Sequence, residues 1–286
     1  MKIQMKDNAK KYLFLGLPKS GKTTYFSLMA NHLQQLANKK ENKLYFKYLP
    51  TMIPDNSQDG AEGNIFKTED LASDFIDDCM NRLSNQRWPK KTVYKSSKGN
   101  SYSFELGKRY WFFKYGIRIG WNRFIIDYHD YSGEAFDVAF GRADGMDAIT
   151  QAIMDEANDM KERIMTADGI FLILDSNELF NGVETSKYGK IIVNLLRYIQ
   201  EKAKTNIKLA VIFNKLELFD GVKINFKSRV RKQYGNAYAY LGSLNYRFFD
   251  VYPLGKIVTN EDGGIVPPPK IIPRNILDPV RWMIEF

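Results

Sequence analysis

The chain has 286 residues, of which 44% are hydrophobic and 26% are charged, and its formal net charge is +9. This composition excludes a disordered or low-complexity protein, and the absence of any apolar run of about 18 residues excludes a transmembrane helix. The segment from Met1 to Lys11 is too polar for a signal peptide, and the single cysteine, Cys79, excludes an internal disulfide. We therefore expect a cytoplasmic protein with no membrane span.

The positive charge is concentrated in two blocks. Residues 1–50 contain ten lysines and two acidic residues, and residues 201–250 contain ten basic and four acidic residues. A basic cluster in the second block could meet an acidic partner, a membrane or a nucleic acid, but it is more typical of a solvated helix face. No basic repeat with interleaved aromatic residues supports a nucleic-acid surface, which stays open as an alternative. The cluster consists of Lys223, Lys227, Arg229, Arg231 and Lys232.

Five short apolar runs, each bounded by polar or turn residues, are typical of strands buried on both faces of a parallel sheet. Helical spacing of apolar residues lies between these runs, and alternating strands and helices predict an α/β fold with a doubly wound, mainly parallel sheet. The predicted strands are Tyr12–Leu15, Phe124–Asp127, Gly169–Asp175, Lys208–Phe213 and Arg247–Tyr252. The predicted helices cover 26–37, 71–83 behind an N-cap at Thr68, 146–165, 187–203, and the end of the chain from Leu277.

The segment from about 92 to 120 departs from this alternation. Tyr102–Leu106 and Tyr110–Ile119 are rich in aromatic residues and are separated by Gly107 and Gly116, which predicts antiparallel strands that extend one edge of the sheet. No repeat and no linker composition interrupts the chain, so we predict one domain over residues 1–286. The predicted loops are 55–64 and 256–270.

A phosphate-binding motif follows the first predicted strand. Residues 16–23 match the Walker A pattern GxxxxGK[ST], and a helix follows at once. The backbone N–H groups of such a loop and the positive end of its helix converge on an anion. Lys22 is expected to reach the β- and γ-phosphates, and Thr23 is expected to offer its hydroxyl to Mg²⁺. The predicted nucleotide-binding residues here are Gly16, Lys19, Ser20, Gly21, Lys22, Thr23 and Thr24.

Three further motifs lie just beyond predicted strands, where parallel sheets bind their ligands. After the second strand, Asp130 is predicted to hold Mg²⁺, commonly through water, while the N–H of Gly133 faces the γ-phosphate. The other two motifs are weak alone, and their order and their positions at strand ends give them weight. They are Asn214-Lys215-Leu216-Glu217 and Tyr252-Pro253-Leu254-Gly255.

These four elements, in this order, resemble the TRAFAC-type, Ras-like P-loop GTPases. The resemblance implies that Asp130 and Gly133 open a second switch region and that Asn214 and Lys215 read guanine. GTP or GDP with Mg²⁺ is then the expected ligand. The loop that completes the base pocket in this family matches Tyr252, Pro253 and Leu254. Asp127 and Asp130 repeat the spacing common at the end of that strand.

More narrowly, the chain is similar to the bacterial double-GTPase group (DO-GTPases), proposed components of conflict and defence systems. This similarity implies a molecular switch in antiviral defence whose protein partner is a second GTPase or an effector. It rests on residues 16–24, Trp88-Pro89-Lys90-Lys91-Thr92, Asp130-Tyr131-Ser132-Gly133-Glu134, Ala167-Asp168-Gly169 and the terminal Pro279-Val280-Arg281-Trp282.

Two positions depart from the guanine-reading pattern. Glu217 stands where an aspartate is expected, and its extra methylene displaces the carboxylate that accepts from guanine. Pro253 has no N–H for guanine O6, a contact that Leu254 or Gly255 could supply instead. Unmade polar contacts weaken discrimination against adenine, so ATP is an alternative ligand.

Two more residues complete the predicted machinery. Thr92 lies between the Walker A motif and Asp130, as a first-switch threonine must, and this role is favoured over the alternative that it begins an edge strand. Glu134 occupies the place of a water-orienting glutamine, and the competing interpretation is an acid at a helix start. The predicted catalytic residues are Lys22, Gly133 and Glu134. The predicted metal ligands are Thr23, Thr92 and Asp130.

The sequence therefore predicts an Mg²⁺-dependent P-loop nucleoside triphosphate hydrolase, favoured as a GTPase switch that is slow unless a partner assists. The alternatives are an ATPase, a P-loop kinase with Arg229 and Arg231 on a lid, and a nucleotide-bound interaction module with little hydrolysis. His32 and His129 are too few and too far apart for a metal or nucleophilic site.

Overall fold

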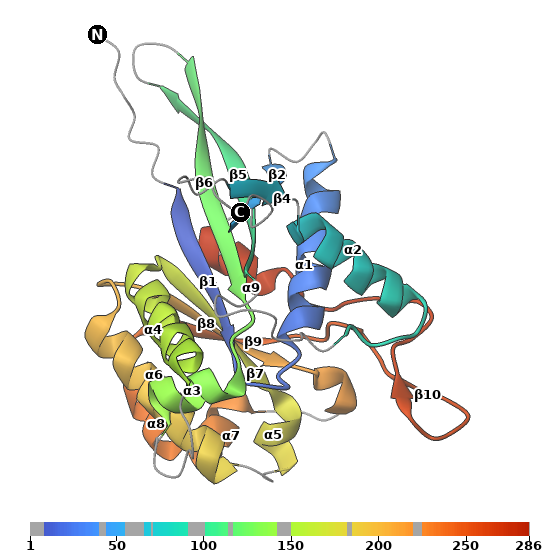
Figure 1. The fold of residues 1–286 in the computed structure, drawn as a ribbon, viewed down its shortest axis with the longest axis vertical. Helices are drawn as coiled ribbons and strands as arrows, with labels where there is room; N and C mark the ends of the chain where they lie inside the picture. The colour runs from blue at the N-terminus through green and yellow to red at the C-terminus, as the bar shows by residue number, and fades with distance from the viewer. Residues whose placement is uncertain are drawn as a thin grey trace, which may run out of the picture.

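A seven-stranded sheet forms the centre of the computed structural model (Figure 1). Five strands are parallel and two antiparallel strands extend one edge, which confirms the predicted α/β fold with a doubly wound, mainly parallel sheet. The structure describes residues 9–39, 44–54, 66–69, 71–90, 101–113, 117–141, 150–181, 185–219 and 225–285. The strand order is β2 (Leu44–Leu49), β5 (Ser101–Phe113), β6 (Ile117–His129), β1 (Lys10–Gly16), β7 (Gly169–Asp175), β8 (Lys208–Asn214) and β9 (Asn245–Asp250).

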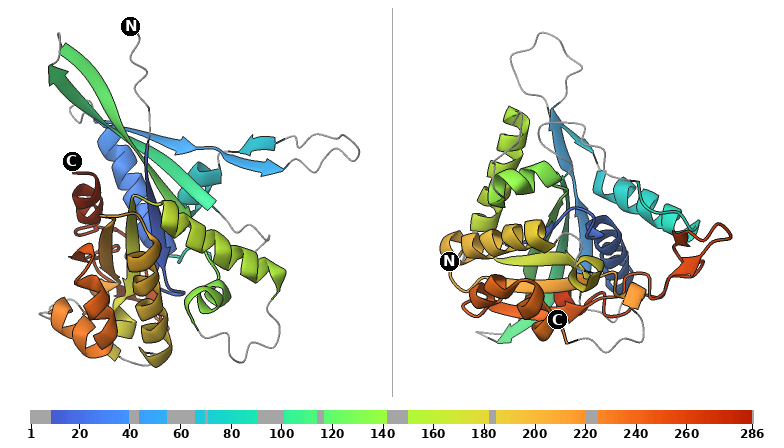
Figure 2. Two further views of the ribbon diagram at one scale, coloured as in Figure 1. Left: turned by 90° about the vertical axis from the view of Figure 1, so that its left-hand side faces the viewer. Right: turned by 90° about the horizontal axis from the view of Figure 1, so that it is seen from below.

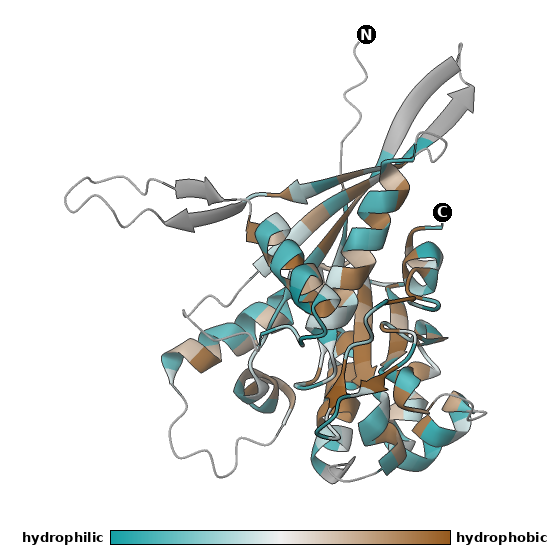
Figure 3. Ribbon diagram, turned by 90° about the vertical axis from the view of Figure 1, so that its right-hand side faces the viewer, coloured by the Kyte–Doolittle hydropathy of each residue, from teal (hydrophilic) through white to brown (hydrophobic). Residues whose placement is uncertain are grey.

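Helices cover both faces of the sheet, because successive residues of the central strands point to opposite faces (Figure 2). In β1, Leu13 and Leu15 belong to one hydrophobic cluster, and Tyr12 and Phe14 belong to the other. Apolar residues accordingly line the strands between the helices (Figure 3). The Phe14 face holds α1 (Lys22–Ala37), α2 (Leu71–Ser84) and α9 (Asp278–Ile284). The Leu13 face holds α3 (Gly133–Phe140), α4 (Gln151–Thr166), α5 (Ser176–Asn181), α6 (Thr185–Lys202), α7 (Phe226–Gln233) and α8 (Gly235–Leu241).

Two local predictions were wrong. Gly107 does not separate strands, because β5 runs through it without a break and pairs with β6 along its whole length. A Cβ on Gly107 would lie 1.8 Å from the Tyr45 ring, so the glycine makes room for that ring on the neighbouring strand. Thr68 does not cap α2, because it lies in β4 (Phe66–Glu69), which pairs with β3 (Thr51–Pro54).

The predicted C-terminal loop contains a short hairpin. Strands β10 (Val258–Thr259) and β11 (Ile265–Val266) pair antiparallel, and their turn includes Gly263 with a φ of 79°. Predicted loop 55–64 and the first part of the predicted helix 146–165 lie outside the described residues. No helix in the described ranges is long and apolar enough to cross a membrane.

Candidate functional site

The loop between β1 and α1 has the geometry of an anion-binding site. Lys19 and Gly21 adopt positive φ angles of 64° and 77°, and Gly21 leaves the start of α1 without a side-chain cap. A Cβ on Gly16 would lie 2.9 Å from the carbonyl oxygen of Ile173, so only glycine fits between β1 and β7. The N–H groups of the first turn of α1 are therefore not capped by a side chain and can donate to an anion.

A buried lysine and an aspartate meet beside this loop. The Nζ of Lys22 lies 3.5 Å from Oδ1 of Asp130 and donates to the carbonyl oxygen of Leu17 at 3.3 Å. Burial lowers the pKa of Lys22, while the charge of Asp130 opposes that shift. The structure thus brings together the residues predicted to contact the γ-phosphate and Mg²⁺.

Tyr128 joins two of the three predicted metal ligands, Thr23 and Asp130, a role that the sequence motifs did not indicate. Its hydroxyl lies 3.0 Å from Oγ1 of Thr23 and is also hydrogen-bonded to Asp130. Tyr128 is fully buried, and burial together with the charge of Asp130 raises its pKa well above the usual value. Alternation along β6, which places Tyr128 on the same face as Ile126, could have identified it.

The side-chain oxygen atoms of Thr23 and Asp130 could hold a magnesium ion whose remaining ligands come from a phosphate and from water. Mg²⁺ is commonly held by one or two protein side chains together with phosphate oxygens and water. Over the described ranges, no group of three or more His, Cys, Asp or Glu residues could hold a metal alone. Thr92, the third predicted ligand, lies outside the described residues.

The residues predicted to read the base are tied to the phosphate loop. Asn214 donates through Nδ2 to the carbonyl oxygen of Ser20 at 2.7 Å. Lys215 donates to the carbonyl oxygen of Lys19 and pairs with Asp175 at 2.6 Å. Asp175 ends β7 and belongs to none of the predicted motifs, although its position at a strand end was a usable indication. These hydrogen bonds hold the β1–α1 loop against the segment that follows β8, so that the two form one continuous surface.

A cavity of about 320 Å³ opens beside this surface. Two buried acceptors among its lining residues, Asn214 Oδ1 and Glu217 Oε2, have no hydrogen-bond partner within the described part of the chain. Burial raises the pKa of Glu217 to about 7, against the opposing effects of nearby N–H groups and of the Lys215 and Arg274 charges. The lining residues are Gly21, Thr24, Trp88, Asn214, Lys215, Glu217, Leu218, Pro253, Leu254, Ile257 and Ile265.

Only part of the predicted base-pocket loop after β9, Tyr252 to Leu254, lines the cavity. Pro253 and Leu254 line the cavity, whereas the described lining does not include Tyr252. The backbone of Tyr252 pairs with Arg274, whose guanidinium lies 4.0 Å from the centre of the Tyr252 ring. The N–H of Gly255 donates to the carbonyl oxygen of Tyr252, so it is engaged in the turn, and the N–H of Leu254 lies beside the Glu217 carboxyl.

The predicted second switch begins against the phosphate loop. Gly133 starts α3, and a Cβ on it would lie 3.0 Å from Cγ of Pro18. Ser132 caps α3 by accepting from the N–H of Ala135, and it donates its own N–H and hydroxyl to Glu156 at 2.6 and 2.8 Å. Glu156 is only 2% exposed, and no sequence motif indicated it. Glu134 is exposed in the first turn of α3.

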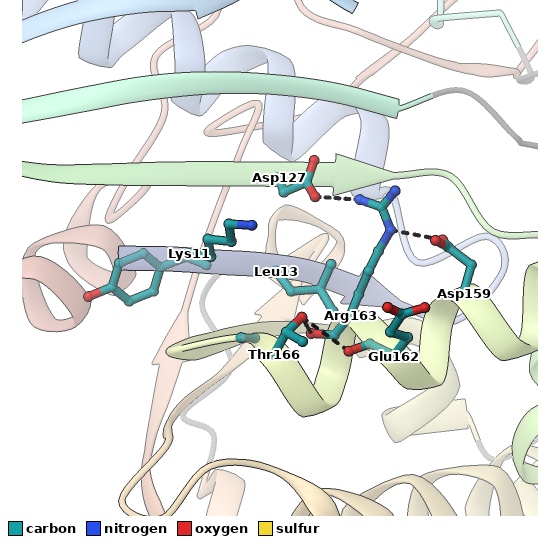
Figure 4. A pocket seen from close by; sticks show the side chains of 9 residues that line it. Lys11, Leu13, Asp127, Asp159, Glu162, Arg163 and Thr166 are labelled. Carbon is teal, nitrogen blue, oxygen red and sulfur yellow. Dashed lines mark hydrogen bonds and ion pairs between the residues drawn. The ribbon is translucent and has the colours of Figure 1, made fainter. Parts of the chain in front are cut away.

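Asp127 belongs to a different cavity, of about 290 Å³, between β1, β6 and α4 (Figure 4). Arg163 lies between Asp127 and Asp159, at 2.5 and 2.8 Å, and the hydroxyl of Tyr131 donates to Asp159 at 2.9 Å. Asp127 thus fastens α4 to the sheet through Arg163 and does not touch the phosphate loop.

The remaining candidates, His129 and the arginines of the basic cluster, line neither of the two cavities. His129 is buried against the Tyr131 ring, and burial and the Arg163 charge lower its pKa to about 4, which keeps it neutral. Arg229 and Arg231 lie on α7, where Arg229 stacks 4.9 Å from the centre of the Phe180 ring. Neither arginine lines the two cavities described above. Lys223 of the basic cluster lies outside the described residues.

No family model matches the chain, and no curated protein matches it. Solved structures with a similar course of the chain include a signal recognition particle receptor SRb-GTP/SRX complex from Chaetomium thermophilum, at 12% identity and a TM-score of 0.44, covering 87% of this chain and 93% of that one. A second is the structure of Methanosarcina barkeri Roco2 RocCORdC bound to GDP, with 14% sequence identity and a TM-score of 0.32. This match covers 87% of this chain and 45% of that one. A third is the G domain of the T. maritima FeoB iron transporter, with 14% sequence identity and a TM-score of 0.31. This match covers 87% of this chain and 91% of that one. TM-scores below 0.5 identify neither a family nor an activity.

Proposed function

We propose that this chain is an Mg²⁺-dependent nucleoside triphosphate hydrolase, with a guanine nucleotide as its ligand, that acts as a molecular switch. The observation that carries this proposal is the joining of two half-sites by hydrogen bonds. The phosphate half consists of the Gly16–Thr23 loop with Asp130, and the base half is the cavity floored by Asn214 and Glu217.

The phosphate half suits triphosphate chemistry. Lys22 would supply a point charge to a phosphate, and the first turn of α1 would supply N–H donors. Thr23 and Asp130 would hold Mg²⁺, which when bound would offset the charge that develops on the phosphate oxygens. In-line attack by water then requires a group that orients the water. Glu134 is the candidate, and Gly133 offers its N–H to the γ-phosphate from the start of α3.

The base half suits a purine edge. Guanine presents two N–H donors on one edge, and buried carboxylate and amide oxygens without other partners are the acceptors that such an edge requires. Adenine is the second candidate, because a Glu217 carboxyl with a pKa of about 7 is partly protonated near neutral pH and can then also donate.

The biological role that we propose is a switch whose partner is a second GTPase or an effector of a bacterial conflict system. Nucleotide-dependent ordering around Thr92 and Asp130–Glu134 would present different surfaces to that partner. A kinase is less favoured, because Arg229 stacks on Phe180 and does not line the nucleotide cavity.

The test combines calorimetry with a phosphate-release assay. We expect GTP to bind in the presence of Mg²⁺ and to release phosphate without any added acceptor, which a kinase would scarcely do. Lys22→Ala removes a charge-assisted contact and is expected to weaken triphosphate binding by about 2 kcal/mol, or roughly 30-fold, and to abolish turnover. Lys39→Ala, just beyond the end of α1, is the matched control. Equal GTP binding by wild type and Lys22→Ala would overturn the site.

A further inference from the structure

The nucleotide cavity has one side that neither the phosphate-binding motif nor the two motifs predicted to read the base supply. It is formed by Trp88, which follows α2, and by Ile265 of the β10–β11 hairpin, residues that are 177 positions apart in the sequence. The indole Nε1 of Trp88 donates to the carbonyl oxygen of Ile265 at 3.0 Å, and the side chain of Gln86 donates to the carbonyl oxygen of Pro267 at 3.4 Å. Two hydrogen bonds thus fasten the hairpin and Pro267, which follows it, to the segment after α2. Figure 1 shows this segment running beside the hairpin's end of the chain.

The exposure of these side chains is unusual for their type. Trp88 is 44% exposed and Ile265 is 47% exposed, although both lie beside a cavity and the core residues around the sheet are almost fully buried. An exposed indole and an exposed isoleucine on one wall favour a flat apolar partner, because covering them removes apolar surface from water.

The floor of the cavity, formed by Asn214 and Glu217, is polar where the wall is apolar. This contrast indicates which part of the ligand lies here. Asn214 and Glu217 are nine-tenths or more buried and each presents an acceptor without a partner within the described ranges. A group with hydrogen-bond donors along its edge and apolar faces above and below would satisfy both the floor and the wall. A heterocyclic base has this character, whereas ribose and phosphate do not.

We propose that Trp88 and the β10–β11 hairpin form a roof that covers the face of the bound base, an inference that rests on the proposed function. By excluding water, the roof strengthens the hydrogen bonds that Asn214 and Glu217 make to the edge of the base. The same C-terminal segment supplies Pro253 and Leu254 to the floor, so one stretch of chain, from Pro253 to Ile265, surrounds the base on two sides.

The test compares a nucleotide with a ligand that has no base. Binding of mant-GDP and of mant-ADP is measured directly, and tripolyphosphate affinity is measured by competition, for wild type, Ile265→Ala, Trp88→Ala and Trp88→Phe. We expect Ile265→Ala to weaken both mant-nucleotides by about fivefold and Trp88→Ala by tenfold or more, mainly through faster dissociation. Trp88→Phe, which keeps an aromatic face, is expected to regain most of the loss. Tripolyphosphate affinity is expected to stay unchanged throughout.

The matched control is Ile272→Ala, because Ile272 is 59% exposed and is not among the described lining residues. Unchanged mant-nucleotide affinity in Ile265→Ala and Trp88→Ala would overturn the roof alone. Equal weakening of mant-nucleotide and tripolyphosphate would also overturn it, because the residues would then support the whole site. If wild type binds tripolyphosphate but neither mant-nucleotide, or binds none of the three, the proposed function fails and the roof fails with it.

Discussion

Glu217 gives the base cavity a charge that changes near neutral pH. Burial raises the pKa of this carboxyl to about 7, so it is mostly neutral below that pH and mostly ionised above it. In the proposed function, the ionised form can accept from both N–H donors on the edge of guanine, whereas the neutral form can donate to adenine N1 and accept from its amine. The preference for GTP over ATP is therefore predicted to rise, by about tenfold, between about pH 6 and about pH 8.

Competition of GTP and ATP for one fluorescent analogue, repeated across that pH range, measures this preference. Glu217→Gln removes the titrating group and is expected to abolish the pH dependence. Glu217→Asp shortens the side chain by one methylene and is expected to raise the guanine preference and to keep a pH dependence. A ratio of GTP to ATP affinity that is flat with pH in the wild type would contradict the assigned role.

Tyr128 is predicted to orient the side-chain oxygen atoms of Thr23 and Asp130, which we propose as ligands of Mg²⁺. Thr23 can give its proton to the Tyr128 hydroxyl while that hydroxyl donates to Asp130, which leaves lone pairs of both outer groups for the metal. Tyr128→Phe is expected to reduce the gain in nucleotide affinity on adding Mg²⁺ by roughly fivefold, or about 1 kcal/mol, and to leave binding in EDTA unchanged.

A second buried tyrosine is the control for Tyr128. Tyr25 is also fully buried and donates to the carbonyl oxygen of Ile276 at 3.0 Å. Tyr25→Phe should lower the free energy of unfolding without changing the effect of Mg²⁺. If Tyr128→Phe behaves in the same way as Tyr25→Phe, the hydroxyl of Tyr128 serves only the core.

Between elements, Glu156 joins α4 to the start of α3. Both of its oxygen atoms accept from Ser132, and one of these bonds comes from a backbone N–H that has no other acceptor in the described contacts. Glu156→Ala is therefore predicted to lower the free energy of unfolding by about 1–3 kcal/mol, measured by urea denaturation. Glu162→Ala, at an exposed position on the same helix, is expected to change it by less than about 0.5 kcal/mol. Equal effects of the two variants would contradict this role.

A helix or strand could be predicted from the sequence when the residues that determine it are neighbours in the chain, and not when a distant segment determines it. Strand β7 matches the predicted Gly169–Asp175, because a continuous apolar run between polar residues suffices to indicate a strand that is buried on both faces. Strand β2 was missed, because Leu44–Leu49 is only half-buried and is held by pairing with β5, a partner about 60 residues away. Thr68 is likewise held by strand pairing, which overrides its preference as a helix cap.

The candidate site divides in the same way. The Gly16–Thr23 loop could be predicted because its glycines, lysine and threonine are neighbours in sequence. Glu156 could not, because it meets Ser132 across 24 residues and no motif includes it. Alternation along β6 could place Tyr128 on the buried face, but not against Thr23, which it meets across 105 residues. Asp127 shows the converse, since its spacing from Asp130 suggested a shared role and the structure pairs it with Arg163 instead.

Over the whole molecule, the proposed second switch is connected to α4, on one face of the sheet. Ser132 is bonded to Glu156, and Tyr131 is bonded to Asp159, so two residues of the switch are held by α4. Arg163 then fastens α4 to β6. A movement of Gly133 toward a γ-phosphate would therefore be carried to α4, on the face of the sheet opposite to α1.

Hydrogen exchange in the diphosphate and triphosphate states tests this connection. We predict that the triphosphate slows exchange in residues 85–95 and 128–145, and also in the first half of α4, because only the triphosphate offers a γ-phosphate to Gly133. Strands β8 and β9, which are not bonded to the switch by any contact described here, serve as the internal reference. Glu156→Ala should retain the response of 128–145 and weaken that of α4, because the bond from Tyr131 to Asp159 remains. If both nucleotides protect these segments equally, the nucleotide is a structural ligand, because a ligand can shift a conformation only through different contacts with its two states.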